Sequence, residues 1–357
     1  MDRDNAAANA VPDWFMILVS VPIIVGFLWF GRGFLTPLAI TGLVFILSSA
    51  MVDRICSVSI AGASLPRWLA TLIAASIVIL GLVFLGSILS EAGDEIAASG
   101  PEYVEKLDGL ATRVGGHLGD RIMGSITDAA SDLDIGGWVA AAAGQLAGGL
   151  ATVALIALYL AFLISERAAW VEKLPRMASS EADAKHLRKI LQRVSDGVKQ
   201  YMWVNVVTSA MSGMVAYVIF SQVGLDFAPL LAVIVFVVGF IPTIGAFIGV
   251  TLPSLVALLQ FDSLTPFLIV LLGYGLADQL IGNVVQPAMQ GKSLNLSTFM
   301  VTVSLTFWGM IWGGIGAFLA VPMMVVITVI CAEIPAMRWF AILLSSDGLL
   351  DVSEEEA

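Results

Sequence analysis

The stretch GFIPTIGAFIGVTLPSL at residues 239–255 decides the fold, because it interrupts a long apolar segment with glycines and prolines. Its tetrapeptide IGAF, residues 244–247, returns at residues 315–318 inside the stretch FWGMIWGGIGAFLAVPMM. A proline follows each copy, Pro253 after the first and Pro322 after the second. Two hydrophobic segments of one chain are therefore broken in nearly the same way.

The composition around these segments is that of a membrane protein. Of the 357 residues, 59% are hydrophobic and 13% are charged, and the mean hydropathy is +0.95. Soluble domains are nearer half apolar and a quarter charged. The composition predicts an all-α, polytopic integral membrane protein that forms a single transmembrane domain over residues 1–357. The net charge of −11 disfavours nucleic acid as a partner.

Apolar runs of ~20 residues, enough for a helix to cross the bilayer, set the expected spans. They fall at residues 14–30, 34–51, 66–89, 141–164, 202–221 and 264–286. Two polar segments lie between them. Residues 90–137 are acidic and predict a helical insertion outside the cytoplasm, whereas residues 166–201 carry a helical apolar stripe and predict a cytoplasmic amphipathic helix. Ser180 and Asp183 are spaced as a capping box at its start.

Lysine and arginine set the expected orientation. With a cytoplasmic N-terminus, most of the 17 basic residues fall in cytoplasmic segments, as the positive-inside rule requires. Both termini are then cytoplasmic. The N-terminal residues lack the basic region of a signal peptide, so the first apolar segment is expected to be retained.

The two broken segments, residues 228–260 and 299–333, do not fit ordinary spans. Each is too long for one crossing and short for two, which need about 40 residues plus a turn. Helix-breaking residues near their middles are Gly239, Pro242 and Gly245 in the first and Gly309, Gly313, Gly314 and Gly316 in the second. Each segment is therefore predicted to be a helical hairpin that dips into the membrane and turns back, shielded from lipid by protein or by a water-filled cavity.

The predicted topology brings the two hairpins in from opposite faces of the membrane. This is the signature of an inverted repeat, whose broken helices converge on a substrate site at the midplane. The alternative is that short apolar words recur by chance in a chain rich in glycine, alanine and phenylalanine.

The helix between the hairpins carries polar residues. Gln279, Asn283 and Gln286 lie at i, i+4 and i+7 on one face, with Asp278 beside it. An aspartate at the centre of a membrane helix costs ~3 kcal/mol, so it normally faces protein, water or a partner. Asp278 is either a proton carrier or a carboxyl group bonded to a neighbouring helix. The amide stripe either binds a solute or joins helices.

Other chemistry finds little support. The sequence GKS at residues 291–293 is not a phosphate loop, because Gln286 stands where that motif requires glycine. The cysteines and histidines, which are Cys56, Cys331, His117 and His186, lack the spacing of a metal or disulfide framework. No nucleophile–base constellation is visible. We therefore expect neither an enzyme nor a cofactor or metal site.

Three stretches in the second half resemble the autoinducer-2 exporter family of bacterial permeases. They are FIPTIGAFIGVTLPSLVALL at 240–259, GNVVQPAMQGKSLNLS at 282–297 and FWGMIWGGIGAFLAVPM at 307–323. The resemblance is strong over residues 200–333 and weaker before them. Relatives often have a carboxylate before the proline at position 287, where this chain has Gln286, so Asp278 becomes the nearby candidate for ion coupling.

The resemblance implies a secondary carrier in the bacterial inner membrane. Family members are proposed to export autoinducer-2, a quorum-sensing signal, or to exchange sodium or lithium for protons. It also implies a homo-oligomer, expected to be a pentamer, with an elevator-like moving domain. Our leading hypothesis is proton-linked export of a small polar organic solute, in which Asp278 changes protonation and the amide stripe binds hydroxyl groups. The alternatives are a monovalent cation/proton antiporter and, outside transport, a membrane scaffold.

Overall fold

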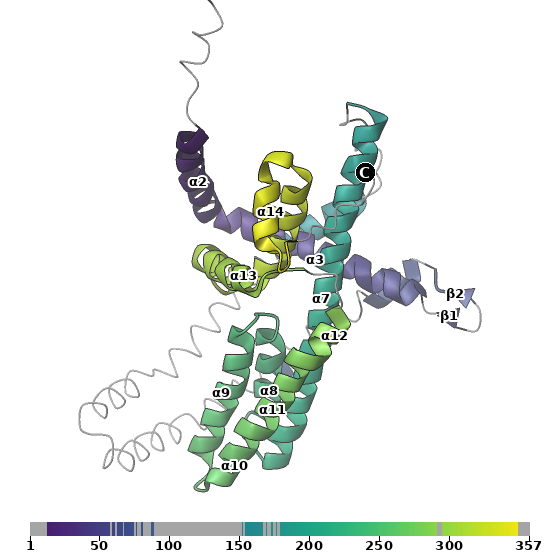
Figure 1. Cartoon of the computed structure of the whole chain (residues 1–357). Coiled ribbons are helices and arrows are strands. Elements are labelled where there is room, and N and C mark those ends of the chain that lie inside the picture. Colours follow the sequence, from purple (N-terminus) through teal and green to yellow (C-terminus); the bar gives the residue numbers. More distant parts are fainter. Residues whose placement is uncertain are drawn as a thin grey trace, which may run out of the picture. The chain divides into compact units, whose positions relative to one another are not determined.

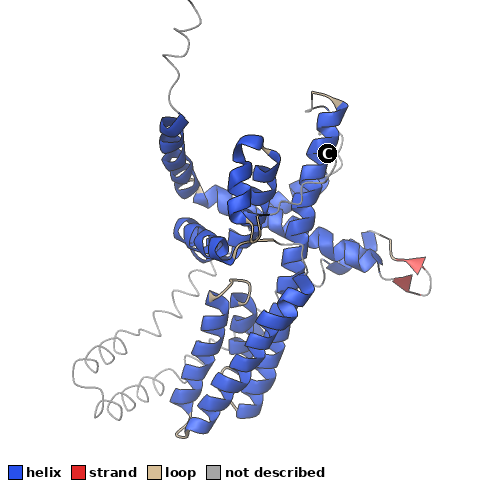
Figure 2. Cartoon of the chain, in the orientation of Figure 1, coloured by secondary structure: helices blue, strands red, loops and turns tan. Residues whose placement is uncertain are grey.

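The computed structural model describes residues 13–57, 179–290 and 295–348 continuously, together with parts of 59–88 and 152–176. Helices make up nearly all of the described chain (Figure 2). Within these residues the only strands are β1 (Ser59–Ile60) and β2 (Ala63–Ser64), a two-residue antiparallel pair. The expected insertion at 90–137 lies outside the described residues, and the expected helices at 66–89 and 141–164 are described in part.

The helices follow one another along the chain as labelled in Figure 1. The α-helices are α2 (Asp13–Phe30), α3 (Arg32–Ser57), α7 (Glu181–Val223), α8 (Ala228–Val238), α9 (Ile244–Gln260), α10 (Leu264–Leu268), α11 (Gly275–Leu280), α12 (Gln286–Gln290), α13 (Thr298–Glu333) and α14 (Arg338–Leu344). The π-helical turns η1 (Ile269–Tyr274) and η2 (Ile281–Val285) join α10, α11 and α12 into one helical run, and η3 (Pro335–Met337) is a short 3₁₀ turn.

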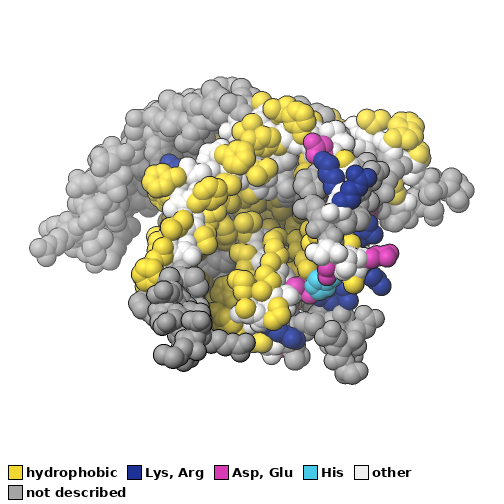
Figure 3. All heavy atoms as spheres, turned by 90° about the horizontal axis from the view of Figure 1, so that it is seen from above, with side chains coloured by type: hydrophobic (Ala, Val, Ile, Leu, Met, Phe, Trp, Pro, Cys, Tyr) yellow, Lys and Arg dark blue, Asp and Glu magenta, His cyan; other side chains and the backbone are white. Residues whose placement is uncertain are grey.

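Four helical segments of the described chain are long and apolar enough to cross a membrane. They are Arg32–Cys56, Glu181–Val223, Leu264–Gln290 and Thr298–Glu333. This finding confirms the predicted class, an all-α polytopic membrane protein. Figure 3 shows hydrophobic side chains over much of the coloured surface. Exposed apolar side chains such as Phe30, Phe247 and Met310 are suited to contact with lipid or protein.

The chain divides into two compact units. Unit 1 comprises residues 1–44, 155–170 and 296–357, and unit 2 comprises residues 45–154 and 171–295. Helix α3 therefore contributes to both units, and helices α7 to α12 belong to unit 2. Each unit is described by itself below.

Helix α7 is one continuous helix of 43 residues in unit 2. Ser180 caps its start, since the Ser180 hydroxyl accepts a hydrogen bond from the Asp183 backbone N–H at 3.1 Å. Gly224, in the left-handed conformation with φ 75°, ends it. No proline interrupts this stretch, so the amphipathic segment before residue 201 and the apolar segment after it form a single helix.

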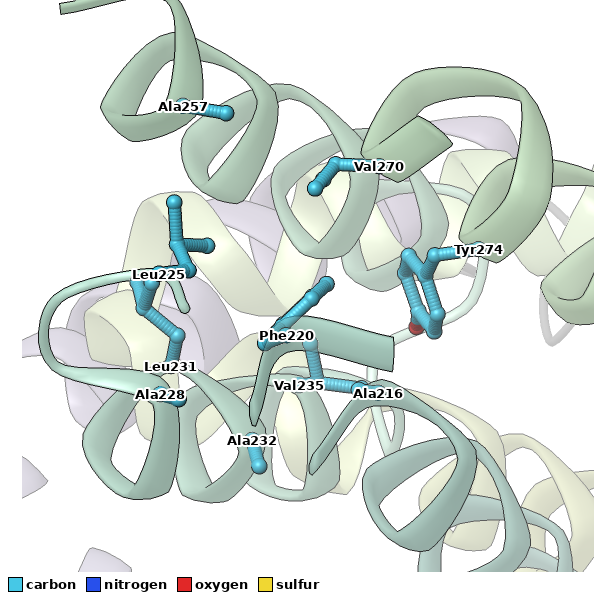
Figure 4. Close-up of a cluster of buried hydrophobic side chains, with 10 residues drawn as sticks. All are labelled: Ala216, Phe220, Leu225, Ala228, Leu231, Ala232, Val235, Ala257, Val270 and Tyr274. Atoms are coloured by element: carbon cyan, nitrogen blue, oxygen red, sulfur yellow. The ribbon is translucent and has the colours of Figure 1, made fainter. Parts of the chain in front are cut away.

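The core of unit 2 lies where α7, α8, α9 and η1 meet (Figure 4). Phe220 of α7 and Tyr274 of η1 make an edge-to-face contact, with ring centroids 5.4 Å apart. Their neighbours in this cluster are Ala216, Leu225, Ala228, Leu231, Ala232, Val235, Ala257 and Val270. This apolar packing fixes the position of Tyr274, whose hydroxyl belongs to the site described below.

Helices α8 and α9 form a hairpin joined by residues 239–243. Glycine is required at Gly245 because a Cβ atom there would clash with the Val238 carbonyl group. The first turn of α9 therefore lies directly against the last turn of α8. The first IGAF copy supplies the glycine that permits this close approach.

In unit 1, α13 likewise turns back on itself. Gly313 has φ 66° and ψ −146°, a conformation that favours glycine, and the helix direction breaks there. The Ser304 hydroxyl donates to the Ala320 carbonyl at 3.0 Å, so the two arms lie side by side. A Cβ at Gly316, in the second IGAF copy, would clash with the Trp308 carbonyl. The repeated glycine thus has the same steric role in both hairpins.

Candidate functional site

Unit 2 contains a cavity of about 760 Å³. Its walls come from α7, from the α8–α9 turn with the start of α9, and from the helical run between η1 and the start of α12. The polar residues among its lining are Asn205, Thr208, Ser209, Ser212, Thr243, Thr251, Tyr274, Asp278, Gln279, Asn283 and Gln286. Seven residues singled out from the sequence therefore line one cavity, and they are Gly239, Pro242, Gly245, Asp278, Gln279, Asn283 and Gln286.

Asp278 is partly buried and accepts two hydrogen bonds from protein hydroxyl groups. The Ser212 hydroxyl donates to Asp278 Oδ1 at 3.0 Å, and the Tyr274 hydroxyl donates to the same oxygen at 3.1 Å. Ser212 belongs to α7, whereas Tyr274 lies one helical turn before Asp278. A carboxyl group in an apolar helix is thus hydrogen-bonded to a neighbouring helix. Its role as a proton carrier remains a prediction.

The amide side chains form two pairs. Asn283 Nδ2 donates to Gln279 Oε1 at 2.6 Å, and both residues are exposed on the cavity side of the helical run. Gln286 Nε2 donates to Asn205 Oδ1 of α7 at 3.1 Å. Gln286 therefore joins two helices, while Gln279 and Asn283 bond each other and stay exposed in the cavity.

The α7 wall of the cavity was not foreseen from the sequence. Asn205, Thr208, Ser209 and Ser212 are all buried and lie at i, i+3, i+4 and i+7. The helical spacing of these four polar residues is present in the sequence, but they lie within the apolar segment 202–221, whose hydropathy predicts a membrane span and no binding site. Thr208 bonds its own helix, at 2.9 Å from the Val204 carbonyl, whereas Asn205 and Ser212 bond the opposite wall.

The α8–α9 turn closes another side of the cavity under conformational strain. Thr243 has φ 61°, which is unusual for a residue with a branched β-carbon. Such outliers cluster at ligand sites and switch regions. Pro242 precedes it, and the Thr243 hydroxyl donates to the Pro242 carbonyl at 2.6 Å.

The remaining predicted site residues, Gly313, Gly314 and Gly316, belong to the α13 turn in unit 1. They do not line the cavity of unit 2. A joint site formed by both hairpins remains a prediction. In the described part of the chain, no group of three or more His, Cys, Asp or Glu side chains is placed to hold a metal ion.

The fold and the cavity together define a class, a helical membrane protein with a polar site between its spans. The model of the AI-2E family transporter matches residues 18–336. The chain therefore belongs to the AI-2E transporter family, which confirms the resemblance found in the sequence, and it is a multi-pass membrane protein of a transporter family.

Several transport proteins are similar to this chain in sequence. The AI-2 transport protein TqsA of Escherichia coli (strain K12) is 26% identical over 287 residues, covering 78% of this chain and 81% of TqsA. A putative transport protein of Haemophilus influenzae is 26% identical over 310 residues, covering 84% and 88% of the two chains. Another, from Borreliella burgdorferi, is 28% identical over 207 residues, covering 58% and 57%.

Proposed function

We propose that the protein is a secondary transporter that exports a small polar organic solute, similar to autoinducer-2, in exchange for protons. The observation that carries the proposal is a solute-sized cavity with one carboxyl group in its wall. The cavity measures about 760 Å³, within the range of ~300–1,000 Å³ typical of small-molecule sites. TqsA, described as an AI-2 transport protein, supports this choice of cargo.

In this proposal, the polar residues of the cavity wall have different roles in transport. Asp278 gains and loses the proton, and Oδ2 is the oxygen that we assign to it because both protein hydrogen bonds fall on Oδ1. Gln279 and Asn283 offer amide groups to hydroxyl or carbonyl oxygens of the solute. The Asn205–Gln286 hydrogen bond joins α7 to the helical run, and these two elements form facing walls of the solute site.

Alternating access would use the two hairpins. We propose that both are re-entrant and that they enter from opposite faces of the bacterial inner membrane, with both chain termini in the cytoplasm. The shared steric role of Gly245 and Gly316 supports a repeated unit. By family resemblance, the transporter would work as a homo-oligomer.

The second candidate function is exchange of sodium or lithium for protons. It is favoured by three oxygens gathered at Asp278, namely its own Oδ1 and the hydroxyl groups of Ser212 and Tyr274. Small hard cations prefer such oxygen ligands. The volume of the cavity, far above that of one ion, favours the organic solute.

Flux into reconstituted vesicles separates these two functions. The wild-type chain is placed in vesicles under an imposed pH gradient, and uptake of autoinducer-2 and of sodium is followed in parallel. Gradient-dependent movement of autoinducer-2 supports the exporter. Sodium movement without autoinducer-2 movement replaces it by the antiporter, and movement of neither contradicts both.

A further inference from the structure

The described lining of the cavity contains an acidic side chain and no basic side chain. Within the described chain, Asp278 is the only lining residue with a carboxyl group, and no Lys, Arg or His side chain lines the cavity. The remaining polar lining groups are hydroxyls and amides. A solute in this cavity therefore meets one acidic side chain and neutral hydrogen-bonding groups, with no basic side chain of the described chain beside them.

Two basic residues of unit 2, Lys199 and Arg54, are engaged away from this cavity. Lys199 pairs with Asp53 at 3.1 Å, and the Arg54 guanidinium lies 5.0 Å from the Trp203 ring centre. These four residues line a separate cavity of about 470 Å³, together with Asp196. Their positive charges are balanced there by two carboxylates.

The N-terminus of helix α9 forms part of the cavity wall. A helix N-terminus ordinarily attracts anions. Here two of the first backbone N–H groups are already engaged. Those of Ile244 and Gly245 donate to the carbonyls of Pro242 and Ile241 at 2.7 and 2.8 Å. The turn thus occupies two of the four donors that a phosphate or carboxylate would use at this helix start.

From these observations we infer that the cavity admits neutral or positively charged solutes and rejects anions. The inference rests on the proposed function, because it takes the cavity to be the solute site. An anion entering a low-dielectric cavity loses its hydration and finds no positive partner. A neutral polyhydroxylated or carbonyl compound replaces its water contacts with the amides of Gln279 and Asn283. The phosphorylated or carboxylated form of the same compound is excluded.

Cysteine modification tests the charge of the cavity without knowledge of the solute. Cys56 and Cys331 are replaced by serine and alanine, and Asn283→Cys places one thiol in the cavity wall. The full chain is reacted with two methanethiosulfonates, one carrying a trimethylammonium group and one a sulfonate. Each rate is divided by the rate of the same reagent with free 2-mercaptoethanol.

We expect the cationic reagent to be favoured at Asn283→Cys by roughly 10-fold or more after this correction. The matched control adds Asp278→Asn, which should remove most of the preference while leaving the cavity in place. Gln279→Cys serves as a second position if the first variant does not fold.

An equal or faster corrected rate for the sulfonate would overturn the inference. So would failure of both reagents at both positions, since a cavity open to solutes must admit one of them. The ratio of rates is independent of transport. If the wild-type chain moves no solute in the vesicle experiment, the proposed function is contradicted, whereas the charge selectivity of the cavity is still decided by the reagent rates.

Discussion

The Ser212 hydroxyl of α7 donates a hydrogen bond of 3.0 Å to Asp278 Oδ1, joining two residues that are 66 positions apart in the chain. The Tyr274 hydroxyl adds a second bond to the same oxygen. Because Tyr274 is itself held by Phe220, the carboxyl group is fixed by two elements. This arrangement explains how an apolar span accommodates an aspartate.

Replacing Ser212 by alanine removes the contact between α7 and the carboxyl group. We expect a loss of about 1–2 kcal/mol in the free energy of unfolding, together with weaker gradient-driven flux. Thermal unfolding in detergent and vesicle flux measure the two effects. Ser254→Ala is the control, since the buried Ser254 hydroxyl bonds only its own helix, at 2.7 Å from the Val250 carbonyl. Equal behaviour of the two variants would contradict the assigned role of Ser212.

Gly245→Ala places a methyl group against the Val238 carbonyl and forces the two arms of the first hairpin apart. The expected cost is about 1–3 kcal/mol, as for other overpacked sites. Gly42→Ala in α3 is the matched control, because nothing lies within 4 Å of a Cβ there. A lower thermal midpoint for Gly245→Ala alone is the predicted result, and equal midpoints would refute the steric argument.

The adjacent glycines of α13 form a matched pair of their own. Gly313→Ala strains a backbone with φ 66°, whereas Gly314 has ordinary geometry and open space around its Cβ position. We expect Gly313→Ala to lower stability by about 1–3 kcal/mol and Gly314→Ala to have little effect. Unfolding of both variants under the same conditions decides the matter. Similar losses at both positions would show that the turn is located elsewhere.

The Asn205–Gln286 bond is best tested by a double-mutant cycle. Each alanine substitution alone leaves an unpaired amide partner, so the double substitution should cost less than the sum of the single ones. We expect a coupling free energy of about 0.5–1.5 kcal/mol. The same cycle built on Thr208, which bonds its own helix, with Gln286 should show no coupling. Additive effects in the first cycle would mean that the pair does not hold the helices together.

Much of the architecture could be read from the sequence because it follows from local rules. Hydropathy was enough to predict the all-α membrane class, and glycine and proline marked the chain reversals now seen at residues 239–243 and at Gly313. Helix α7 was less predictable. Its polar and apolar halves differ in hydropathy but share one uninterrupted backbone, and hydropathy reports the surroundings of a helix rather than its length.

The partners within the site could not be predicted, because they depend on contacts between distant segments. Asp278 and Gln286 stood out as polar residues in an apolar helix, yet nothing in one sequence pairs them with Ser212 and Asn205. The π-helical turn η2 was also unforeseen. It ends at Val285, two residues before Pro287, whose missing N–H and bulky ring disturb the hydrogen bonds of the preceding turn.

The measurement that tests the central claim most directly compares two modes of transport in the Asp278→Asn variant. Autoinducer-2 flux in reconstituted vesicles is followed under an imposed pH gradient and, separately, as exchange at equal pH. We predict that the variant loses gradient-driven flux and keeps exchange, because the cavity remains while the proton carrier is gone. Asp262→Asn, at an exposed turn away from the cavity lining, should behave as the wild type. Gradient-driven flux that survives in Asp278→Asn would contradict the account.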